Sequence, residues 1–453
     1  MARAKKETAL TPEERLQAAL VPDWEWPYKL PENWCWTTVG AINQYVGISA
    51  DPTKAKNKTF ELYSVPSSAD NYPEIVLGAD IGSTKQSVKK GDVLLCKINP
   101  RINRVWKVSK YTDHSLLASS EWIVIRNSGL ISNYLMWCFR SPYFRGYMLS
   151  NVSGVGGSLM RAQPKFVQGY PVPVPPLAEQ HRIVDRIESL FAKLDEAKEK
   201  AQAVVDSFET RKAAILHKAF TGELTAKWRE EHGVGMESWE HHQFSDLCAI
   251  VRGGSPRPAG DPRYYDGNIP FMKVADITRN DSPYVSKVEY SIKEEGLKKT
   301  RMVEANTLLL TNSGATLGVP AITTIRTTFN DGIAAFIGLD IDSLLFYYYF
   351  WTSKTAFLRS INMGAAQPNL NTKLIGEVEI DVPQTAERVE IARVLNALLS
   401  KEQQAKEAAE AVLDQIDLMK KSILARAFRG ELGTNDPSEE SAVGLLKRGL
   451  EKK

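Results

Sequence analysis

Cationic and amide side chains crowd one stretch of the sequence, KINPRINRVWK. They are Lys97, Asn99, Arg101, Asn103, Arg104 and Lys107. Arginine and lysine bond guanine edges or phosphates, and asparagine can bond adenine through two hydrogen bonds. A loop of this composition near a strand end is suited to DNA, and a solvated hairpin with ordinary surface charge is an equally good interpretation. Nearby Lys85, Lys89 and Lys90 fit phosphate contacts or plain surface.

A second set of polar side chains lies beyond residue 250. The stretch VRGGSPRPAGDPRYY and the run after it carry Arg252, Arg257, Arg263 and Lys273. Gly253 and Gly254 would let the backbone approach a phosphate closely. The polar loop TNSGATLG adds Asn312 and Ser313. An ordinary Gly- and Pro-rich surface loop explains these residues equally well.

Two Gly-rich segments follow these clusters. They occupy residues 154–161, which end in Arg161, and residues 363–369. We expect them either to line the same groove as the polar clusters or to form tight connections into the next element.

The sequence lacks the short motifs that support catalysis. It has no G-x-x-x-x-G-K-[ST] for nucleotide phosphates, and GVGGSL fails the dinucleotide-binding pattern at its last position. Asn99-Pro100 is followed by Arg101, so the N-P-P-aromatic motif that resembles an amino-methyltransferase active site is missing. The six histidines show no metal-ligand spacing. We therefore predict no catalytic residue, no metal site and no cofactor bound by this chain.

A duplicated segment must position these clusters. Residues 178–224 align without a gap with residues 386–432, a shift of 208 positions, and 20 of 47 residues are identical. Both copies end in I-L-x-x-A-F-x-G-E-L. Apolar or small residues recur in alternating steps of four and three, the pattern of a helix that packs along another helix. This favours two long helices that pair with each other over two unrelated surface helices or a homodimeric coiled coil.

The apolar stripe predicts the seam between the helices. In the first copy the seam residues are Ile183, Ile187, Leu190, Ala201, Val204 and Phe208. In the second copy they are Ile391, Leu395, Leu398, Ala409, Val412 and Ile416. Glu402 interrupts the second stripe. Each long helix follows a segment of about 150 residues, which we call a module, so the chain order is module, helix, module, helix. The simplest geometry is therefore antiparallel and makes a pseudo-twofold molecule.

The segments outside the helices predict mainly strands, because Val, Ile, Leu and Thr are punctuated by Gly, Asn and Pro. The expected fold class is α+β, with two mainly-β domains separated by a pair of long antiparallel coiled-coil helices. The two modules match at their edges, near Trp34 and Trp239, and show no convincing alignment in between. The predicted divisions are an N-terminal extension (1–30), module 1 (31–176), a helical region (177–224), module 2 (225–383), a second helical region (384–432) and a tail (433–453).

The bulk composition fits a globular protein of two or three domains. Of the 453 residues, 43% are apolar and 25% charged, and the formal net charge of +3 neither indicates nor excludes a nucleic-acid binder. The four cysteines are far apart, which fits a reducing compartment. The N-terminal segment has no apolar signal core, and the longest apolar run, at residues 344–351, is too short for a membrane helix. We expect a cytoplasmic protein.

This layout resembles the specificity subunit of type I restriction–modification systems. The resemblance rests on VPVPPLAEQHRIVDRIESLF at residues 172–191, on ILHKAFTGELT at residues 215–225, and on their second copies, IDVPQTAER and ILARAFRGEL. The module edges LPENWCWTTV, VRGGSPR and AAQPNLN match the family too. The resemblance covers roughly residues 30–432.

The resemblance implies a non-catalytic subunit that binds double-stranded DNA. Each module would read one half of a bipartite site, and the helices would fix the gap between the halves. Two methyltransferase subunits would dock on the helices and use S-adenosylmethionine to methylate adenine, and motor-nuclease subunits would use ATP and Mg²⁺. Glu402 and Arg388 depart from the first helical copy, so the two docking surfaces are expected to differ. The alternative is a coiled-coil scaffold with protein-binding modules.

Overall fold

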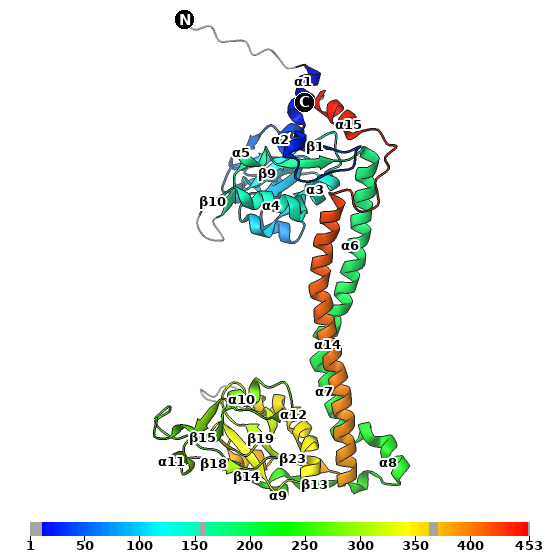
Figure 1. Ribbon diagram of the computed structural model, residues 1–453. Helices are drawn as coiled ribbons and strands as arrows, with labels where there is room; N and C mark the ends of the chain where they lie inside the picture. Colours follow the sequence, from blue (N-terminus) through cyan, green and yellow to red (C-terminus); the bar gives the residue numbers. More distant parts are fainter. Residues whose placement is uncertain (1–10, 155–159, 362–369, 452–453) are drawn as a thin grey trace. The chain divides into compact units, whose positions relative to one another are not determined.

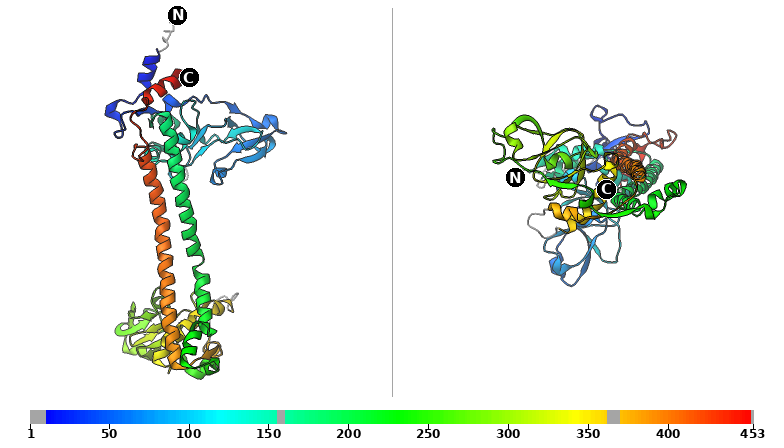
Figure 2. Two further views of the ribbon diagram at one scale, coloured as in Figure 1. Left: turned by 90° about the vertical axis from the view of Figure 1, so that its right-hand side faces the viewer. Right: turned by 90° about the horizontal axis from the view of Figure 1, so that it is seen from below.

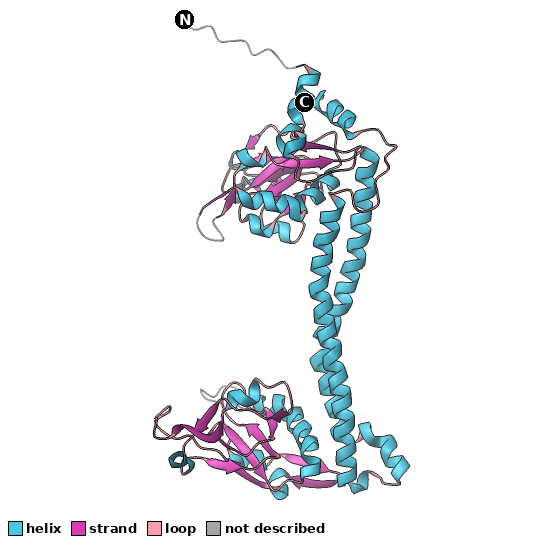
Figure 3. Ribbon diagram, viewed as in Figure 1, coloured by secondary structure: helices cyan, strands magenta, loops and turns pink. Residues whose placement is uncertain are grey.

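A computed structural model describes residues 11–154, 160–361 and 370–451. The chain forms two compact units, Met1–Lys200 with Ala411–Lys453 (unit 1) and Ala201–Glu410 (unit 2). Each unit combines a module of strands and short helices with a stretch of long paired helices (Figures 1 and 3). The predicted α+β class is confirmed.

The module of unit 1 is built on a buried antiparallel sheet. Its central strand pairs Leu94 with Trp106 on one side and with Val124 on the other. Successive side chains of the central strand enter two different cores, since Leu94 packs among Trp106 and Val124 while Leu95 packs against Tyr134 and its neighbours. The sheet has the order β7 (Val105–Lys107), β6 (Val93–Cys96) and β9 (Trp122–Ile125), and α3 (Ser132–Arg140) and α4 (Pro142–Ser150) cover one face.

A second sheet of unit 1 packs beside the first. Its neighbouring strands β8 and β3 run parallel, and its other pairs are antiparallel. The strand order is β2 (Ser49–Ala50), β5 (Lys85–Ser87), β8 (Ser115–Ala118), β3 (Thr59–Tyr63) and β4 (Glu74–Leu77).

The module of unit 2 contains a five-stranded and a four-stranded sheet. The helix α12 (Leu344–Ser360) covers the larger sheet, and its apolar run packs against Phe244 and Phe336 in the core. The five-stranded order is β14 (Ala249–Arg252), β22 (Ile333–Ile337), β19 (Thr307–Thr311), β20 (Pro320–Thr323) and β16 (Tyr284–Val285). The four-stranded order is β17 (Tyr290–Ile292), β15 (Tyr265–Met272), β21 (Thr327–Phe329) and β18 (Arg301–Val303).

The two modules share a central arrangement that their sequences do not reveal. The antiparallel order β7-β6-β9 of unit 1 recurs in unit 2 as β20-β19-β22. In each module the first strand also pairs antiparallel with the last one, β1 (Cys35–Thr38) with β12 (Pro171–Val174) and β13 (Glu240–Gln243) with β23 (Glu379–Val382). A common backbone therefore carries different side chains in the two modules.

The duplicated segments form long helices (Figure 2). The first copy is divided into α6 (Leu177–Asp206) and α7 (Phe208–Phe220), whereas the second is continuous as α14 (Thr385–Ala427). The division falls at Ser207, whose hydroxyl donates back to Ala203 O, a bond that bends helices.

The helices pair antiparallel within each unit. In unit 1 the start of α6 packs against the end of α14, and Asp195 forms an ion pair with Lys420. In unit 2, α7 packs against the first half of α14, and Arg211 pairs with Glu402 at 2.7 Å. Glu402, which interrupts the apolar stripe, thus faces a cation on the other helix.

One predicted seam residue, Val412, is misplaced. It is 43% exposed, because the buried stripe steps by four from Ala409 to Leu413 and then by three to Ile416. Among the other predicted seam residues, the structure buries Ile183, Ile187, Ala201, Phe208, Ile391, Leu395, Ala409 and Ile416, and half-buries Leu190, Val204 and Leu398.

A buried glutamate at the start of each long helix fastens the adjoining module. In unit 1, Trp34 Nε1 donates to the Glu179 carboxylate at 2.7 Å. Thr434 and Asn435, which follow the second helical copy, donate to the same carboxylate at 3.2 and 2.8 Å. Three segments distant in sequence are joined at one buried group.

Unit 2 repeats this junction with an added cation. Trp239 Nε1 donates to the Glu387 carboxylate at 3.1 Å, and Thr225 donates at 2.7 Å. Arg229 completes the site with a buried ion pair of 2.6 Å. The two edge tryptophans noted in the sequence therefore have the same structural role.

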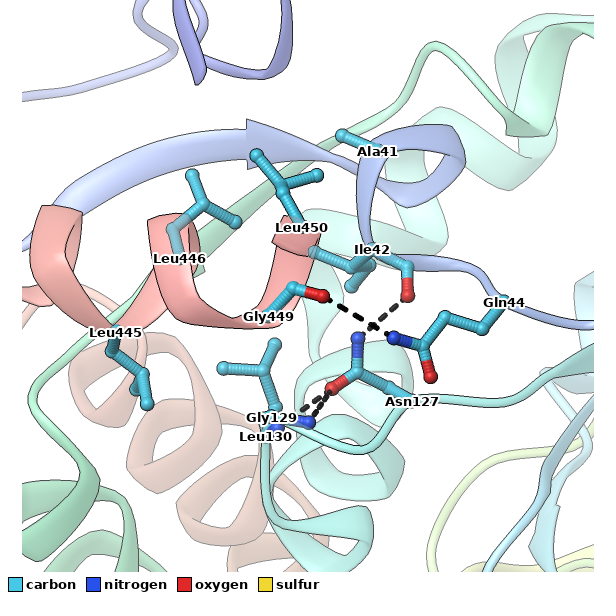
Figure 4. A pocket seen from close by; sticks show the side chains of 10 residues that line it. All are labelled: Ala41, Ile42, Gln44, Asn127, Gly129, Leu130, Leu445, Leu446, Gly449 and Leu450. Atoms are coloured by element: carbon cyan, nitrogen blue, oxygen red, sulfur yellow. Dashed lines mark hydrogen bonds between the residues drawn. The ribbon is translucent and has the colours of Figure 1, made fainter. Parts of the chain in front are cut away.

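The chain ends of unit 1 pack on its module. The helices α1 (Pro12–Ala19) and α15 (Ala442–Glu451) lie together, with Lys447 bonded to Glu13 at 2.7 Å. Figure 4 shows α15 against Ile42 and Leu130, with Gln44 donating to Gly449 O at 3.4 Å. The cavity there holds only about 10 Å³, so this contact is packing and leaves no ligand site. None of the helices in the described ranges is long and apolar enough to cross a membrane.

Candidate nucleic-acid interface

Backbone hydrogen bonds gather the first polar cluster at the end of β6. Lys97 N donates to Glu121 O at 3.0 Å, and Ala162 N donates to Lys97 O at 2.8 Å. Asn99 N donates to Met160 O at 2.8 Å. The loop after β6 therefore lies beside the turn before β9 and beside the segment that ends the module. We call residues 97–104, 119–121 and 160–162 the module 1 interface.

Two asparagines shape the loop of this interface. Asn99 and Asn103 flank the short helix η5 (Pro100–Ile102) with φ angles of 46° and 51°, a left-handed conformation that asparagine tolerates better than most residues. The Asn103 amide also donates to Arg140 O at 3.1 Å. Asn103 therefore has a structural role in addition to its predicted one, since one N–H of its amide is used within the protein.

The charged residues of the cluster divide by position. Arg101 and Arg161 are exposed, and Arg161 forms an ion pair with Glu121 at 3.4 Å, a surface contact that DNA can replace at low cost. Lys97 and Arg104 are half-buried in the same loop. The prediction that Lys107 belongs to this cluster is wrong. Its ammonium donates to Asn133 of α3 at 2.5 Å, at the other end of β7. The fold does not bring Lys107 into the module 1 interface.

In unit 2, residues of the second polar cluster contact the turn before β22, residues 330–332. Arg252 Nε donates to Asp331 O at 2.7 Å, and Ser255 Oγ donates to the Asp331 carboxylate at 2.6 Å. Arg257 is exposed and lies 3.7 Å from the same carboxylate. We call residues 252–257, 312–313 and 330–332 the module 2 interface.

Lys273 lies beside this turn, and Arg263 is held elsewhere. Asn330 N donates to the carbonyl of the residue before Lys273 at 3.0 Å. The Lys273 ammonium stands 3.1 Å from the ring centroid of Tyr290, a cation–π contact. Arg263 forms a bidentate pair with Asp261, and hydrogen bonds from that guanidinium lower the pKa of Asp261 to about 2. Within the described residues no hydrogen bond or ion pair joins Arg263 to the turn, so the prediction that it shares this interface gains no support.

The two interfaces use the same backbone frame. Asn312 N donates to Gly332 O at 2.9 Å, and Leu370 N donates to Asn312 O at 2.7 Å. This pattern repeats the bonds of Lys97 in unit 1, so Asn312 occupies the position of Lys97. The register pairs Ala162 with Leu370, although the A-Q-P letters near the module ends suggest another match.

The prediction that the Asn312 side chain binds DNA is not supported by its position. It is fully buried, and neither polar atom of its amide has a hydrogen-bond partner within the part of the chain that the structure describes. A buried amide cannot touch a base in this conformation. Ser313, the next residue, is half-buried at the surface of the loop.

The sequence reasoning missed a lysine-rich loop in unit 1. Lys54, Lys56 and Lys58 lie in and after the short helix η2 (Pro52–Ala55), around an open crevice. The alternation of lysines in TKAKNK was the available signal, since exposed lysines in a loop can serve as phosphate contacts.

Two predicted elements lie wholly or partly outside the described residues. They are the Gly-rich segments at 154–161 and 363–369, of which the structure describes Gly154, Met160 and Arg161. Within the described ranges, no group of His, Cys, Asp or Glu side chains is arranged to hold a metal ion.

Known proteins resemble the chain in both sequence and fold. A family model described as the type I restriction modification DNA specificity domain matches residues 236–411. The chain is 23% identical over 351 residues to the type I restriction enzyme EcoKI specificity subunit of Escherichia coli strain K12, covering 72% of this chain and 73% of that protein. It is 25% identical to the StySPI specificity subunit of Salmonella potsdam, with 70% of each chain covered.

A solved structure shares the fold. The HsdS subunit from Thermoanaerobacter tengcongensis matches with a TM-score of 0.66 at 21% identity, covering 90% of this chain and all of that one.

Proposed function

The chain belongs to the specificity subunits of type I restriction–modification systems, which are non-catalytic DNA-recognition subunits, and we propose that its two modules read the two halves of a split, asymmetric DNA site. One observation carries the proposal. The same backbone frame, centred on Lys97 in one module and on Asn312 in the other, is surrounded by different exposed side chains, Arg101 and Arg161 in module 1 and Arg257 in module 2. A shared frame with different donors is what two different half-sites require.

Charge supports DNA as the ligand of both interfaces. Arg101 and Arg161 are exposed in module 1, and Arg257 is exposed in module 2. Each interface also contains a carboxylate, Glu121 or Asp331, that pairs with an arginine. These weak surface pairs hold the guanidinium groups in place until phosphates or guanine edges replace the carboxylates.

The long helices are proposed to bind two methyltransferase subunits and to set the spacing of the half-sites. Exposed apolar side chains on α14 in unit 1, at Val412, Leu418 and Met419, suit a protein partner. S-adenosylmethionine would be bound by those partners, which would methylate adenine, and ATP and Mg²⁺ by motor-nuclease subunits. The complex would act in the cytoplasm, where its DNA lies.

Methylation mapping tests the proposed function. A genome expressing the chain with its methyltransferase subunit is expected to carry methylated adenines in one bipartite motif. Exchange of residues 31–176 for another module 1 should change one half of the motif and leave the other half unchanged. The alternative, a protein-binding scaffold, predicts that a gel shift of the complex on random-sequence DNA shows no sequence selection.

A substitution at the helix seam tests the spacing role. Ala201 of α6 is buried, so Ala201→Arg forces a large charged side chain into a buried position and is expected to destabilise the chain by about 1–3 kcal/mol. The gap between methylated half-sites should then lose its fixed length. The exposed neighbour Gln202→Arg is the control. A fixed gap in the Ala201→Arg complex would refute the role of the helices in spacing.

A further inference from the structure

An open groove adjoins the module 1 interface on the side of the second sheet. It has a volume of about 530 Å³, and Gly47, Ile48, Lys85, Gln86 and Ser120 contribute to its lining. Its two sides are joined because β2 pairs with β5, with Ala50 opposite Lys85. The groove is therefore part of the folded sheet.

Hydrogen bonds connect the groove to the turn of the interface. Gln86 Nε2 donates to Ser119 O at 3.0 Å and to Trp122 O at 2.9 Å. These bonds fix β5 against residues 119–121, and Ser120 lines the groove from that turn. A ligand in the groove would be continuous with one on the module 1 interface.

Lys85 is the cation of this groove, and its ammonium is held in place. Nζ donates to Ser83 O at 3.1 Å and to Ser83 Oγ at 2.5 Å. An ammonium has three N–H donors, so one remains for a ligand. Partial burial lowers the pKa of Lys85, which agrees with a partly desolvated position where a hydrogen bond discriminates more strongly than in water.

The segment that leads into β2 carries two exposed apolar side chains, one of which lines the groove with this cation. Val46 is 77% exposed and Ile48 is 54% exposed. Ile48 lines the groove directly. A cation next to an exposed aliphatic side chain matches the edge of a base step in the major groove, where a guanine offers acceptors and a thymine offers a methyl group.

In module 2 the position equivalent to Ser120 carries a charged residue that is already paired within the protein. Trp122 N donates to Ser119 O at 3.1 Å, and Ile333 N donates to Asn330 O at 3.1 Å, so Asp331 is the counterpart of Ser120. The Asp331 carboxylate is occupied by Ser255 and Arg257, whereas Ser120 faces the open groove. The two modules thus differ in chemistry at one equivalent place.

We propose that this groove receives a base edge of the half-site read by module 1, with Lys85 donating to a guanine O6 or N7 and Ile48 contacting a neighbouring thymine methyl. The inference rests on the proposed function and names a residue that determines specificity. Lys54, Lys56 and Lys58 are better placed for phosphates, because all three are exposed and the crevice around them is lined by the loop itself, with Ala55 as its apolar residue.

The test uses the complex of the full chain with its methyltransferase subunit. A site is first selected from a random duplex library, and binding to each single-base variant of it is then titrated between 50 and 200 mM salt. Lys85→Gln is expected to abolish discrimination at one guanine of one half-site, a loss of about 5- to 150-fold, with the salt dependence unchanged. Ile48→Ser should weaken discrimination at the adjacent position.

Several outcomes overturn this assignment. A uniform loss across all sequences, with the salt slope reduced by about one, would make Lys85 a phosphate contact. Unchanged discrimination in both variants would make the groove irrelevant to reading. Thermal unfolding of each variant checks that the chain still folds. If the wild-type complex selects no sequence, the proposed function fails together with this assignment; if it selects one and Lys85→Gln selects equally well, only the assignment fails.

Discussion

Replacing Arg229 with alanine is expected to destabilise unit 2 by about 3–5 kcal/mol, because the change leaves the buried Glu387 carboxylate without its cation. The ion pair measures 2.6 Å, and the two side chains are only 8% and 1% exposed. Thr225 and Trp239 would still donate to Glu387, so we expect the loss to fall at the lower end of that range. Denaturant unfolding of the full chain, followed by tryptophan fluorescence, measures the effect.

A matched control separates burial from ion pairing. Arg448 pairs with Glu440 on the surface, and Arg448→Ala is expected to leave the free energy of unfolding nearly unchanged. The double substitution Arg229→Met with Glu387→Gln removes both charges and should recover much of the stability lost in Arg229→Ala. Equal effects of Arg229→Ala and Arg448→Ala would show that the buried junction does not hold module 2 to its helix.

Exchanging the three lysines of the η2 loop for glutamine is expected to produce the largest change in DNA affinity. If Lys54, Lys56 and Lys58 each neutralise one phosphate, the slope of log affinity against log salt should fall by about 2.7. The wild-type complex would then lose about 40-fold more affinity than the variant between 50 and 200 mM salt. Preference among DNA sequences should be unchanged, because phosphate contacts carry no base information.

The comparison with a remote lysine makes this result specific. Lys227 is an exposed residue of α8 (Ala226–His232) in unit 2, and Lys227→Gln should leave the salt slope unaltered. Fluorescence anisotropy with the selected duplex measures both variants. A normal salt slope in the triple variant would mean that the loop is only a solvated surface.

The asymmetry between the modules agrees with the proposed reading of two different half-sites by one chain. Each interface is held by the same backbone bonds at Lys97 or Asn312, while the side chains around these bonds differ. Reading can therefore change by substitution in loops, without disturbing the strands or the junctions at Glu179 and Glu387. Loops on a rigid scaffold are the usual place for binding residues.

The sequence by itself determined the helices and the class of protein. An apolar stripe with a helical period is local information, so most of the seam could be predicted, and only the exact phase at Val412 was wrong. The polar clusters were visible as well, because cations and amides are dense in two short stretches. The signature at the end of each helical copy indicated the family.

Only the tertiary structure decided which polar residues belong together. The Lys107 ammonium donates to Asn133, the Asn103 amide donates to Arg140 O, and Asn312 is buried. The groove at Lys85 depends on the pairing of β2 with β5. The physical reason is that strand pairing joins residues far apart in the chain and fixes their burial, whereas the period of a helix is written in its neighbouring residues.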